Sequence, residues 1–518
     1  MIDPDRRLFL TMLAGLMSPV PAWAQDTSEG VETTPIQPDF SEEPTPFSEE
    51  LLHAEARALA AAEWKARPSV PEAWRELTFD QHEGIRFDPR SALWEQSDKP
   101  IRLDFYPPGL YFPRPVDIRI VKDGQARKVN FDIDLFTMGQ NVPNLPMDDS
   151  LGFSGFGVRG AVGGPDEFRE FAVFQGASYF RAIARHQNYG ISARGLALRT
   201  GDPEGEEFPE FVKFWVQEPD PGDSRMMVHA LMDSPSLTGV YRFMIEPGDT
   251  TVMDVRSTLY PRVDLDNVGI APLTSMFLFD ETNRSRFDDY RPAVHDSDGL
   301  LAHNRAGELI WRPLSNPVKL QISDFFDRNP RGFGLMQRSR RFSDFADLES
   351  NYHTRPSLWI EPDEDWGEGA VRLIEIPADR EIYDNMVAFW KPREPIPAGS
   401  ETSFNYRMYW GKEARDVPDV SRVLNTRIGA RREGGYFVAI DFAEHSAIPE
   451  DLSTLDVRLS SNRGELSSAI IQRNPETKGP RLAFTLQPGD AETVELRAQL
   501  LLEGETVSEV FLYRWTAT

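Results

Sequence analysis

Short runs of β-forming residues, separated by turn-forming residues, make up most of the chain between residues 69 and 411. The runs are rich in Val, Ile, Phe, Tyr and Trp, and Gly, Pro, Asn and Asp bound them. Long helical patterns between the runs are absent from the sequence, which argues against alternating strand–helix units. We therefore predict an all-β fold in which residues 48–411 form a large antiparallel β-sandwich with long functional loops. Examples of the runs are IRLDFYP (101–107), GVYRFMIEPG (239–248), VRLIEIP (371–377) and MVAFWKP (386–392).

Two local patterns predict which side chains face inward. From Ser48 onward, SEELLHAEARALAAAEWKARP predicts an amphipathic helix with Ser48 as its cap. In FVKFWV (211–216), the two-residue period of a β-strand predicts that alternate side chains point to opposite faces of the sheet. The residues expected on the packed helix face are Leu52, Ala56, Leu59, Ala60 and Trp64. The two strand faces are expected to carry Phe211, Lys213 and Trp215, and Val212, Phe214 and Val216.

The C-terminal part of the chain predicts a second, smaller β domain. Residues 412–423 are charged and contain a proline, which is typical of a linker. Residues 424–518 hold strand-like runs separated by NRG, PGD and EGE turns, which favours an immunoglobulin-like sandwich. His, Asp and Trp are not concentrated there, so we expect binding or bracing from this domain, not chemistry.

The first 24 residues predict an export signal. Arg6 and Arg7 precede the apolar run LFLTMLAGLM, and Ala22-Trp23-Ala24 forms a cleavage site. The order DRRLFL favours the twin-arginine type, with an ordinary unfolded-chain signal as the alternative. No later stretch approaches about 20 apolar residues in a row. We expect a periplasmic protein of a Gram-negative bacterium, whose residues 25–47 form a disordered acidic leader.

Composition excludes several kinds of function. The chain has no cysteine, which rules out disulfides, thiolate catalysis and cysteine-based metal sites. Its net charge of −27 repels nucleic acid and anionic lipid headgroups. A neutral polymer such as a glucan is compatible with this charge.

The stretch RPAVHDSDGL (291–300) places His295, Asp296 and Asp298 in one turn between a proline and a glycine. A calcium turn, a solvated loop and half of a catalytic acid–base pair are the alternatives. The residues that follow lack the further ligands of an EF-hand, so we predict no metal here. Asp298 is expected to hold the turn by bonding backbone amides, and His295 to orient Asp296.

Aromatic and charged side chains are interleaved from residue 289 to residue 390. A carbohydrate groove needs this mixture, because sugar C–H faces stack on rings while hydroxyls bond to charged groups. Aromatic residues also form the ordinary core of a β-sandwich, so both readings are open for each tryptophan. The residues in question include Trp311, Arg312, Arg355, Trp359, Trp366 and Tyr383.

Several long motifs resemble the periplasmic glucan biosynthesis protein G/D family. They are GASYFRAI (176–183), YGISARGLALRTG (189–201), HDSDGL (295–300), NPRGFGLMQRSRRF (329–342), RPSLWIEP (355–362) and DNMVAFW (384–390), among others, in the family's order. The resemblance runs from about residue 72 to the C-terminus. It implies a galactose-mutarotase-like β-sandwich followed by an immunoglobulin-like domain. The twin-arginine signal leans toward the D branch, and the choice between G and D is left open.

The resemblance also implies an activity on osmoregulated periplasmic glucans with a β-1,2-linked backbone. The chain would be an inverting endo-glucanase or a cyclising transglycosylase without a cofactor. The alternative is a non-catalytic factor that binds the glucan leaving the inner-membrane glucosyltransferase. The oligomeric state is left open, with a homodimer among the alternatives.

Carried over by motif, Asp384 is the general acid and Asp296 is the base, which acts through waters and hydroxyls that include Tyr352. The apolar neighbours of Asp384 are expected to raise its pKa so that it stays protonated near neutral pH. The substrate-binding residues are expected to be Tyr179, Arg194, Trp311, Arg312, Arg355, Trp359, Trp366 and Tyr383, with no metal ligands.

Overall fold

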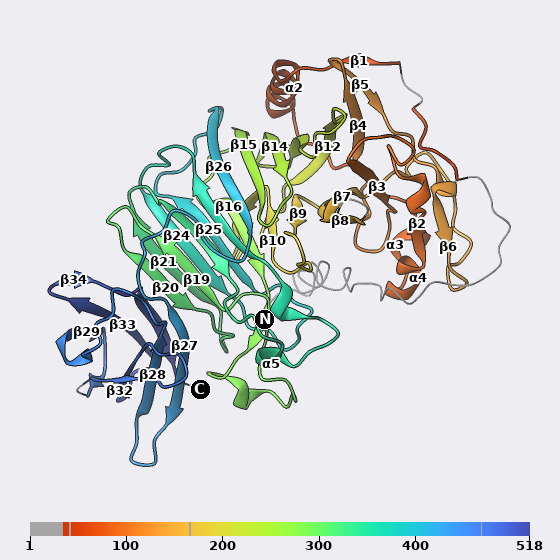
Figure 1. The fold of residues 1–518 in the computed structure, drawn as a ribbon. Coiled ribbons are helices and arrows are strands. Elements are labelled where there is room, and N and C mark those ends of the chain that lie inside the picture. The colour runs from red at the N-terminus through yellow and green to blue at the C-terminus, as the bar shows by residue number, and fades with distance from the viewer. Residues whose placement is uncertain (1–34, 41–42, 165–166, 468, 518) are drawn as a thin grey trace.

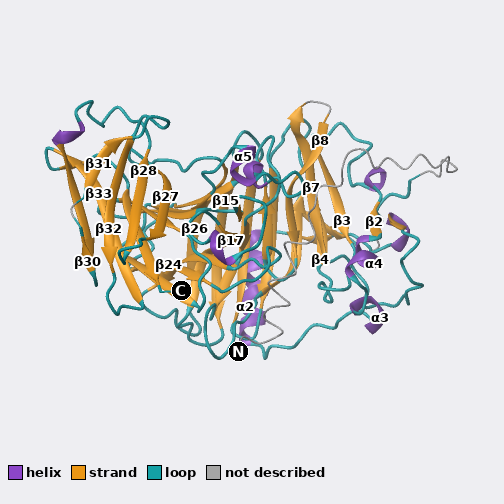
Figure 2. Ribbon diagram, turned by 90° about the horizontal axis from the view of Figure 1, so that it is seen from below, coloured by secondary structure: helices purple, strands orange, loops and turns teal. Residues whose placement is uncertain are grey.

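Two large, mainly antiparallel sheets pack face to face in the computed structural model, which describes residues 35–40, 43–164, 167–467 and 469–517 (Figures 1 and 2). Their shared core contains rings from both sheets: Phe243 of one contacts Phe174 and Phe180 of the other edge-on, with centroids 5.2 and 5.0 Å apart. The prediction of an all-β fold with a large antiparallel part is confirmed.

The larger sheet runs along the whole molecule. Its pairings β4–β12 and β20–β35 are parallel and the others are antiparallel within the described residues. In spatial order its strands are β1 (Thr45–Pro46), β5 (Gln125–Lys128), β4 (Asp117–Lys122), β12 (Glu210–Gln217), β13 (Met226–Asp233), β14 (Leu237–Glu246), β15 (Thr251–Pro261), β26 (Thr402–Gly411), β23 (Ser357–Pro362), β22 (Gly332–Met336), β19 (Gly299–His303), β20 (Leu309–Pro313), β35 (Val510–Thr516), β33 (Thr493–Leu502) and β29 (Leu455–Ser461), with β34 (Glu505–Thr506) beside β33.

The second sheet carries the polar side chains of the candidate site on the face away from the core. Its order is β21 (Gln321–Asp327), β24 (Gly369–Glu375), β25 (Met386–Pro392), β16 (Val268–Ser275), β10 (Ser192–Arg194), β9 (Tyr179–Ala182), β8 (Glu167–Gln175), β7 (Gly155–Gly164) and β3 (Ile101–Tyr106), with β11 (Leu196–Leu198) beside β16. Two short ribbons complete the large part: β2 (Ile85–Phe87) with β6 (Phe136–Met138), and β17 (Phe277–Phe279) with β18 (Val294–His295).

The C-terminal strands form a second layered unit that is continuous with the larger sheet. A separate sheet packs against β29, β33 and β35 over a second hydrophobic core. β26 ends at Gly411 and β27 begins at Val423. The domain boundaries themselves stay a prediction, because β20 pairs directly with β35. The separate sheet contains β27 (Val423–Ala430), β28 (Tyr436–Phe442), β32 (Pro480–Gln487) and β30 (Glu465–Leu466), with β31 (Ile470–Arg473) beside β32.

Helices are short and lie at the edges, except for α2 (Glu49–Ala61), which packs on the larger sheet. Ser48 caps α2 by accepting a hydrogen bond from the amide of Leu51, and Leu52 and Ala56 are buried, as predicted. Trp64 lies beyond the helix and is 38% exposed, so its predicted packing is wrong. The others are α3 (Glu72–Arg75), α4 (Phe79–Glu83), α5 (Phe342–Phe345), and the 3₁₀ helices η1 (Pro89–Ser91), η2 (Ile133–Leu135), η3 (Arg284–Arg286), η4 (Tyr352–Thr354) and η5 (Leu452–Thr454).

The alternation predicted for residues 211–216 is wrong at its first two residues, since Val212 packs on the side of Trp215 and not on that of Phe214. Phe211 packs in the core between the sheets with Phe214, whereas Trp215 faces α2. The register of β12 against β13 shifts between Phe211 and Lys213. A β-bulge adds a residue to one strand and reverses the side-chain direction beyond it.

The predicted export signal (1–24) and the first part of the predicted leader lie outside the described residues. The described end of the leader differs from the prediction, because Thr45–Pro46 pair with Gln125–Ala126 and Phe47 stacks on Trp215. Within the described residues, we find no helix long and apolar enough to cross a membrane.

Candidate active site

Asp384 lies just before β25, in a position fixed by its neighbour Asn385. The Asn385 side-chain amide donates to the backbone oxygens of Phe277 and Ile376, and its oxygen accepts from the amide of Phe277. These three bonds join the start of β25 to β17 and to the residue that follows β24. The carboxyl group of Asp384 is held at the end of the second sheet and is only 3% exposed.

Burial dominates the electrostatics of Asp384 and raises the pKa of its carboxyl from 3.8 to about 6. The guanidinium groups of Arg181 and Arg194 oppose this rise, and the negative charge of Asp296 adds to it. Direct contacts are long: Arg181 Nη2 lies 3.5 Å from Oδ2, and Ser192 Oγ donates to Oδ2 over 3.4 Å. Asp384 is therefore a carboxyl group that gains and loses its proton near neutral pH.

Asp296 lies in the turn between β18 and β19, and it is also 3% exposed. Its amide donates to the backbone oxygen of Met276 over 2.8 Å, which fixes the turn against β16 and β17. Its carboxylate accepts a hydrogen bond from Arg355 Nη1. The guanidinium of Arg355 compensates the buried charge of Asp296.

Tyr352 connects Asp296 to a second carboxylate. The Arg355 guanidinium that holds Asp296 lies over the Tyr352 ring, 4.3 Å from its centroid. The Tyr352 hydroxyl donates to Glu381 Oε2 over 3.1 Å, and burial raises the pKa of Tyr352 well above its ordinary value. Glu381 also pairs with Arg291 at 2.8 Å. The Tyr352 hydroxyl is thus held by a carboxylate acceptor. This acceptor, Glu381, stands three residues before Asp384 in the sequence.

The two predicted catalytic carboxyl groups share one neighbourhood. They come from different parts of the chain, and the charge of Asp296 is close enough to act on the pKa of Asp384. The positive charge of Arg355 is likewise affected by Asp384 as well as by Asp296. The site therefore brings together four residues that lie up to 88 positions apart in the sequence: Asp296, Tyr352, Arg355 and Asp384.

The other two groups of the 295–298 turn are structural. Asp298 Oδ2 accepts hydrogen bonds from the amides of Arg338 and Ser339, which confirms its predicted role in the turn. His295 stacks on Phe277 and meets Phe345 edge-on, and burial lowers its pKa to about 4. Its ring is a neutral part of a hydrophobic cluster. Within the described residues, no group of three or more His, Asp or Glu side chains could hold a metal ion.

Tyr179 and Arg194 lie next to Asp384 on neighbouring strands of the second sheet. The Arg194 guanidinium lies 4.8 Å from the Tyr179 ring centroid and donates to Glu206 over 2.6 Å and to Thr274 over 3.1 Å. Both residues are 2% exposed. Their charges and rings are therefore part of the same buried cluster as Asp384.

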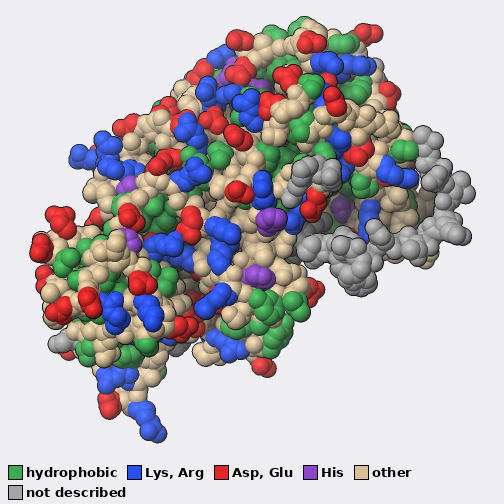
Figure 3. Space-filling view, viewed as in Figure 1, with side chains coloured by type: hydrophobic (Ala, Val, Ile, Leu, Met, Phe, Trp, Pro, Cys, Tyr) green, Lys and Arg blue, Asp and Glu red, His purple; other side chains and the backbone are tan. Residues whose placement is uncertain are grey.

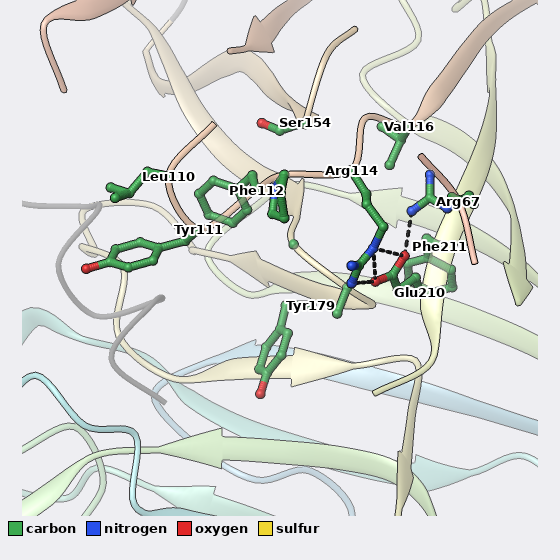
Figure 4. A pocket seen from close by; sticks show the side chains of 13 residues that line it. Arg67, Leu110, Tyr111, Phe112, Arg114, Val116, Ser154, Tyr179, Glu210 and Phe211 are labelled. Atoms are coloured by element: carbon green, nitrogen blue, oxygen red, sulfur yellow. Dashed lines mark hydrogen bonds and ion pairs between the residues drawn. The ribbon is translucent and has the colours of Figure 1, made fainter. Parts of the chain in front are cut away.

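Tyr179 also lines a cavity of about 140 Å³ on the side toward the N-terminal strands (Figure 4). Arg67 and Arg114 converge there on Glu210: Arg67 Nη2 donates over 2.6 Å, Arg114 Nε donates over 2.8 Å, and Arg114 Nη2 donates as well. Figure 4 shows the rings of Tyr111 and Phe112 on the opposite wall, and the Tyr179 hydroxyl pointing away from the cavity.

Four other predicted substrate-binding residues lie in packed cores, which differs from the prediction. Trp311 and Trp359 belong to the core beneath the C-terminal strands, and Trp366 packs against Trp390, Phe404 and Tyr406. Arg312 forms a buried ion pair with Glu375 at 3.0 Å. Alternate positions of β20 and β23 face inward because a second layer covers that side of the sheet. Tyr383 is half-buried against the cluster formed by Ala197, Ile374, Ile376, Val387 and Phe389.

The sequence analysis missed several residues of the site. Arg181, Ser192, Glu206 and Glu381 all contact predicted site residues. Arg181 had a readable signal, because it is a charged residue in the middle of the apolar run SYFRAI. The others had none, since their partners come from distant strands.

The face shown in Figure 3 carries acidic and basic side chains side by side, with hydrophobic side chains gathered over the loops around α5. Exposed members of those loops are Tyr290, Phe342 and Leu348. Ion pairs of Arg291 with Asp347 and Glu381 join three loops near Tyr352: the loop before β18, the loop after α5 and the loop between β24 and β25.

Comparisons with known proteins agree with the motifs. The family described as "Periplasmic glucan biosynthesis protein, MdoG" matches residues 47–515. "Glucans biosynthesis protein G" of Bradyrhizobium diazoefficiens is 45% identical over 471 residues, which cover 91% of this chain and 93% of that protein. The protein of the same name from Vibrio cholerae is 44% identical over 476 residues, with 91% and 87% covered.

A solved structure of a galactose mutarotase related enzyme from Lactobacillus acidophilus overlaps 47% of this chain and 98% of its own. The TM-score of 0.21 and identity of 8% are too low to bear on the fold. The family match and the relatives, in contrast, cover nearly the whole described chain and confirm both the resemblance and the predicted location. The chain is therefore a periplasmic protein that belongs to the periplasmic glucan biosynthesis protein family.

Proposed function

We propose that this protein acts enzymatically on the β-1,2-linked backbone of periplasmic glucans, with Asp384 as general acid and Asp296 as general base. The family supports a role in glucan biosynthesis. The observation that carries the catalytic proposal is the state of Asp384: a fully buried carboxyl with a pKa of about 6, beside the carboxylate of Asp296. Two carboxyl groups with different environments are what acid–base cleavage of a glycosidic bond requires.

Asp384 would donate its proton to the glycosidic oxygen as the C–O bond breaks. On the other side of the sugar, Asp296 would remove a proton from a water molecule or a sugar hydroxyl through a relay. The Tyr352 hydroxyl is a candidate for a place in that relay because a phenol can accept one proton as it passes its own proton on. In the closed arrangement it donates to Glu381, so it would have to turn from Glu381 toward Asp296 to complete the relay. Water as nucleophile gives hydrolysis, and a hydroxyl of the same chain gives a cyclised product.

A polymer cannot reach these groups in the closed arrangement of the structure. Asp384, Asp296 and Tyr352 are each no more than 3% exposed. The loops joined by Arg291 lie beside Tyr352 and must move to admit a glucan. We propose that these loops open for substrate and close to exclude water from unproductive paths.

Incubation with linear β-1,2-glucan, followed by mass spectrometry of the products, tests the proposal. The wild-type protein should shorten the glucan with gain of one water per cut, or yield products that lack one water if it cyclises them. NMR of the first hydrolysis product should show the α-anomer, since inversion of a β-linkage produces it. Asp384→Asn should abolish turnover and retain glucan binding. Binding without turnover by the wild-type protein would instead identify a glucan-binding factor that serves the inner-membrane glucosyltransferase.

A further inference from the structure

Arg181 is a buried cation with unused hydrogen-bonding capacity. It lies in β9, whose residues are all buried, and it is 4% exposed. Its Nε and Nη2 have no hydrogen-bond partner among the residues that the structure describes. Buried donors are nearly always satisfied, because leaving them unpaired costs free energy. The ion pair with Asp384, at 3.5 Å, compensates part of the positive charge of Arg181, but it gives neither Nε nor Nη2 a hydrogen bond.

A second spare donor lies close by. Arg194 uses Nε and Nη1 on Thr274 and Glu206, whereas its buried Nη2 has no partner within the described residues. β10 pairs with β9 so that Arg194 lies opposite Tyr179. Arg181 follows Tyr179 by two residues and therefore points to the same face of the sheet. The unused donors of both arginines thus converge beside Asp384.

Aromatic side chains flank this pair of arginines. The charge of Arg181 acts on the phenols of both Tyr179 and Tyr189, and the Arg194 guanidinium lies 4.8 Å from the Tyr179 ring centroid, so both rings are near the two arginines. Beyond Tyr189 lies Glu170, whose carboxylate accepts from the hydroxyl of Tyr106. Rings beside bundled donors suit a sugar, because the C–H faces stack and the hydroxyls accept hydrogen bonds.

We propose that Arg181 and Arg194 form a subsite for the glucosyl residue next to the scissile bond, in which the spare N–H groups donate to its hydroxyls. This inference rests on the proposed function and names the residues that hold the sugar against Asp384. A neutral sugar satisfies the unused donors without removing the charge of either arginine. Arg181 thereby binds the substrate and also keeps a positive charge beside the acid.

The charge of Arg181 gives the subsite a second, independent readout. Arg181 opposes the rise in the pKa of Asp384, so its removal should raise that pKa further. A general acid with a higher pKa stays protonated to higher pH, and the alkaline limb of activity should move upward. The charged and titratable groups that surround Asp384 are Arg181, Arg194, Asp296, Arg355 and Tyr179.

Calorimetric binding of linear β-1,2-glucan oligosaccharides to the Asp384→Asn protein measures the subsite without turnover. Adding Arg181→Met should weaken binding by about tenfold or more, since charged donors are lost to the sugar. Arg185→Met is the matched control: Arg185 lies four residues away, is half exposed and pairs with Asp249 at 3.3 Å. This control should bind as tightly as the parent protein.

Arg181→Lys separates charge from geometry. The lysine keeps the positive charge but lacks the fork of guanidinium donors. We expect weaker binding than in the parent, with the alkaline limb of the active enzyme unchanged, whereas Arg181→Met should shift the limb to higher pH. Thermal unfolding of each variant checks the fold, and an apolar replacement of a poorly paired buried charge should not lower the melting temperature.

Two failures are distinguishable. If Arg181→Met binds glucan as tightly as its parent and keeps the wild-type pH profile, the subsite is overturned while the proposed function stands. If the wild-type protein neither binds nor converts linear β-1,2-glucan, the proposed function falls, and the subsite falls with it.

Discussion

Two clusters of buried charge in this molecule are built in opposite ways. In the interface cluster, where the C-terminal strands join the larger sheet, Arg338 donates to both oxygens of Glu509, at 2.5 and 2.8 Å. Glu509 also accepts from the amide of Val423, and Arg338 lies 3.5 Å from the ring centroid of Trp311. Arg338 and Glu509 leave no buried side-chain nitrogen or oxygen without a partner in the described structure. In the candidate site, the polar contacts of Asp384 with other described side chains are 3.4 Å and longer, and two donors of Arg181 have no partner among those residues.

On the proposed function, the difference separates charges that hold the fold from charges that bind a ligand. In a complete network, hydrogen bonds and ion pairs offset the free energy lost when the ions leave water. In an incomplete network, part of that loss remains and destabilises the folded protein. Burial raises the pKa of Asp384, and the long contacts with Arg181 and Ser192 reverse only part of that rise. We therefore expect substitutions in the two clusters to differ, with the larger loss of stability in the interface cluster and the larger loss of activity in the candidate site.

Breaking the complete cluster should have the largest effect on stability. Glu509→Ala leaves the guanidinium of Arg338 buried without its carboxylate, which should cost about 3–5 kcal/mol of unfolding free energy. Urea unfolding followed by tryptophan fluorescence measures this. Glu401→Ala, which removes an exposed partner of Arg57, is the control and should leave the unfolding curve unchanged. Equal effects of the two substitutions would contradict the contrast between the clusters.

Removing the charge of Asp384 should stabilise the protein, in a pH-dependent way. Its pKa is raised from 3.8 to about 6 on folding, so ionisation costs stability as pH rises through that interval, and the full cost is present above it. At pH 8, the free energy of unfolding of Asp384→Asn, measured by urea unfolding, should therefore exceed that of the wild-type protein by on the order of 3 kcal/mol. Near pH 4 the difference should be small. A variant that is less stable than the wild type at pH 8 would show that Asp384 is a structural charge.

Removing the weak hydroxyl contact should have the smallest effect. Ser192→Ala deletes a donor that lies 3.4 Å from Asp384 and helps to lower its pKa. The alkaline limb of activity should move slightly upward, with less than about fivefold change in kcat/KM. Steady-state kinetics across pH measure it. A loss as large as that of Asp384→Asn would mean that the hydroxyl, not the arginines, controls the acid.

Much of the fold was predictable because strands carry a local signature. The runs at 101–107 and 386–392 contain β3 and β25, those at 239–248 and 371–377 overlap most of β14 and β24, and the Ser48 cap marks the start of α2. The bulge at Phe211 was not predictable, since a one-residue register shift is decided by the partner strand. Pairing of β20 with β35 joins segments about two hundred residues apart, beyond any local pattern.

The candidate site was predictable only through motifs. Composition suggested that Trp311 and Trp359 line a groove, but both fill a core, because aromatic content does not tell which face of a strand a ring occupies. Asp384 and Asp296 came from the family resemblance, and their common neighbourhood depends on long-range packing of β16, β19 and β25. The unused donors of Arg181 are visible only when the partners on other strands are known.

The pH dependence of kcat/KM on linear β-1,2-glucan tests the central claim most directly. An acid with a pKa of about 6 must be protonated to act, so the rate should fall on an alkaline limb near pH 6, and Asp384→Asn should remove turnover at every pH. Undiminished turnover by Asp384→Asn, or a wild-type rate that stays flat from pH 5 to pH 9, would contradict it.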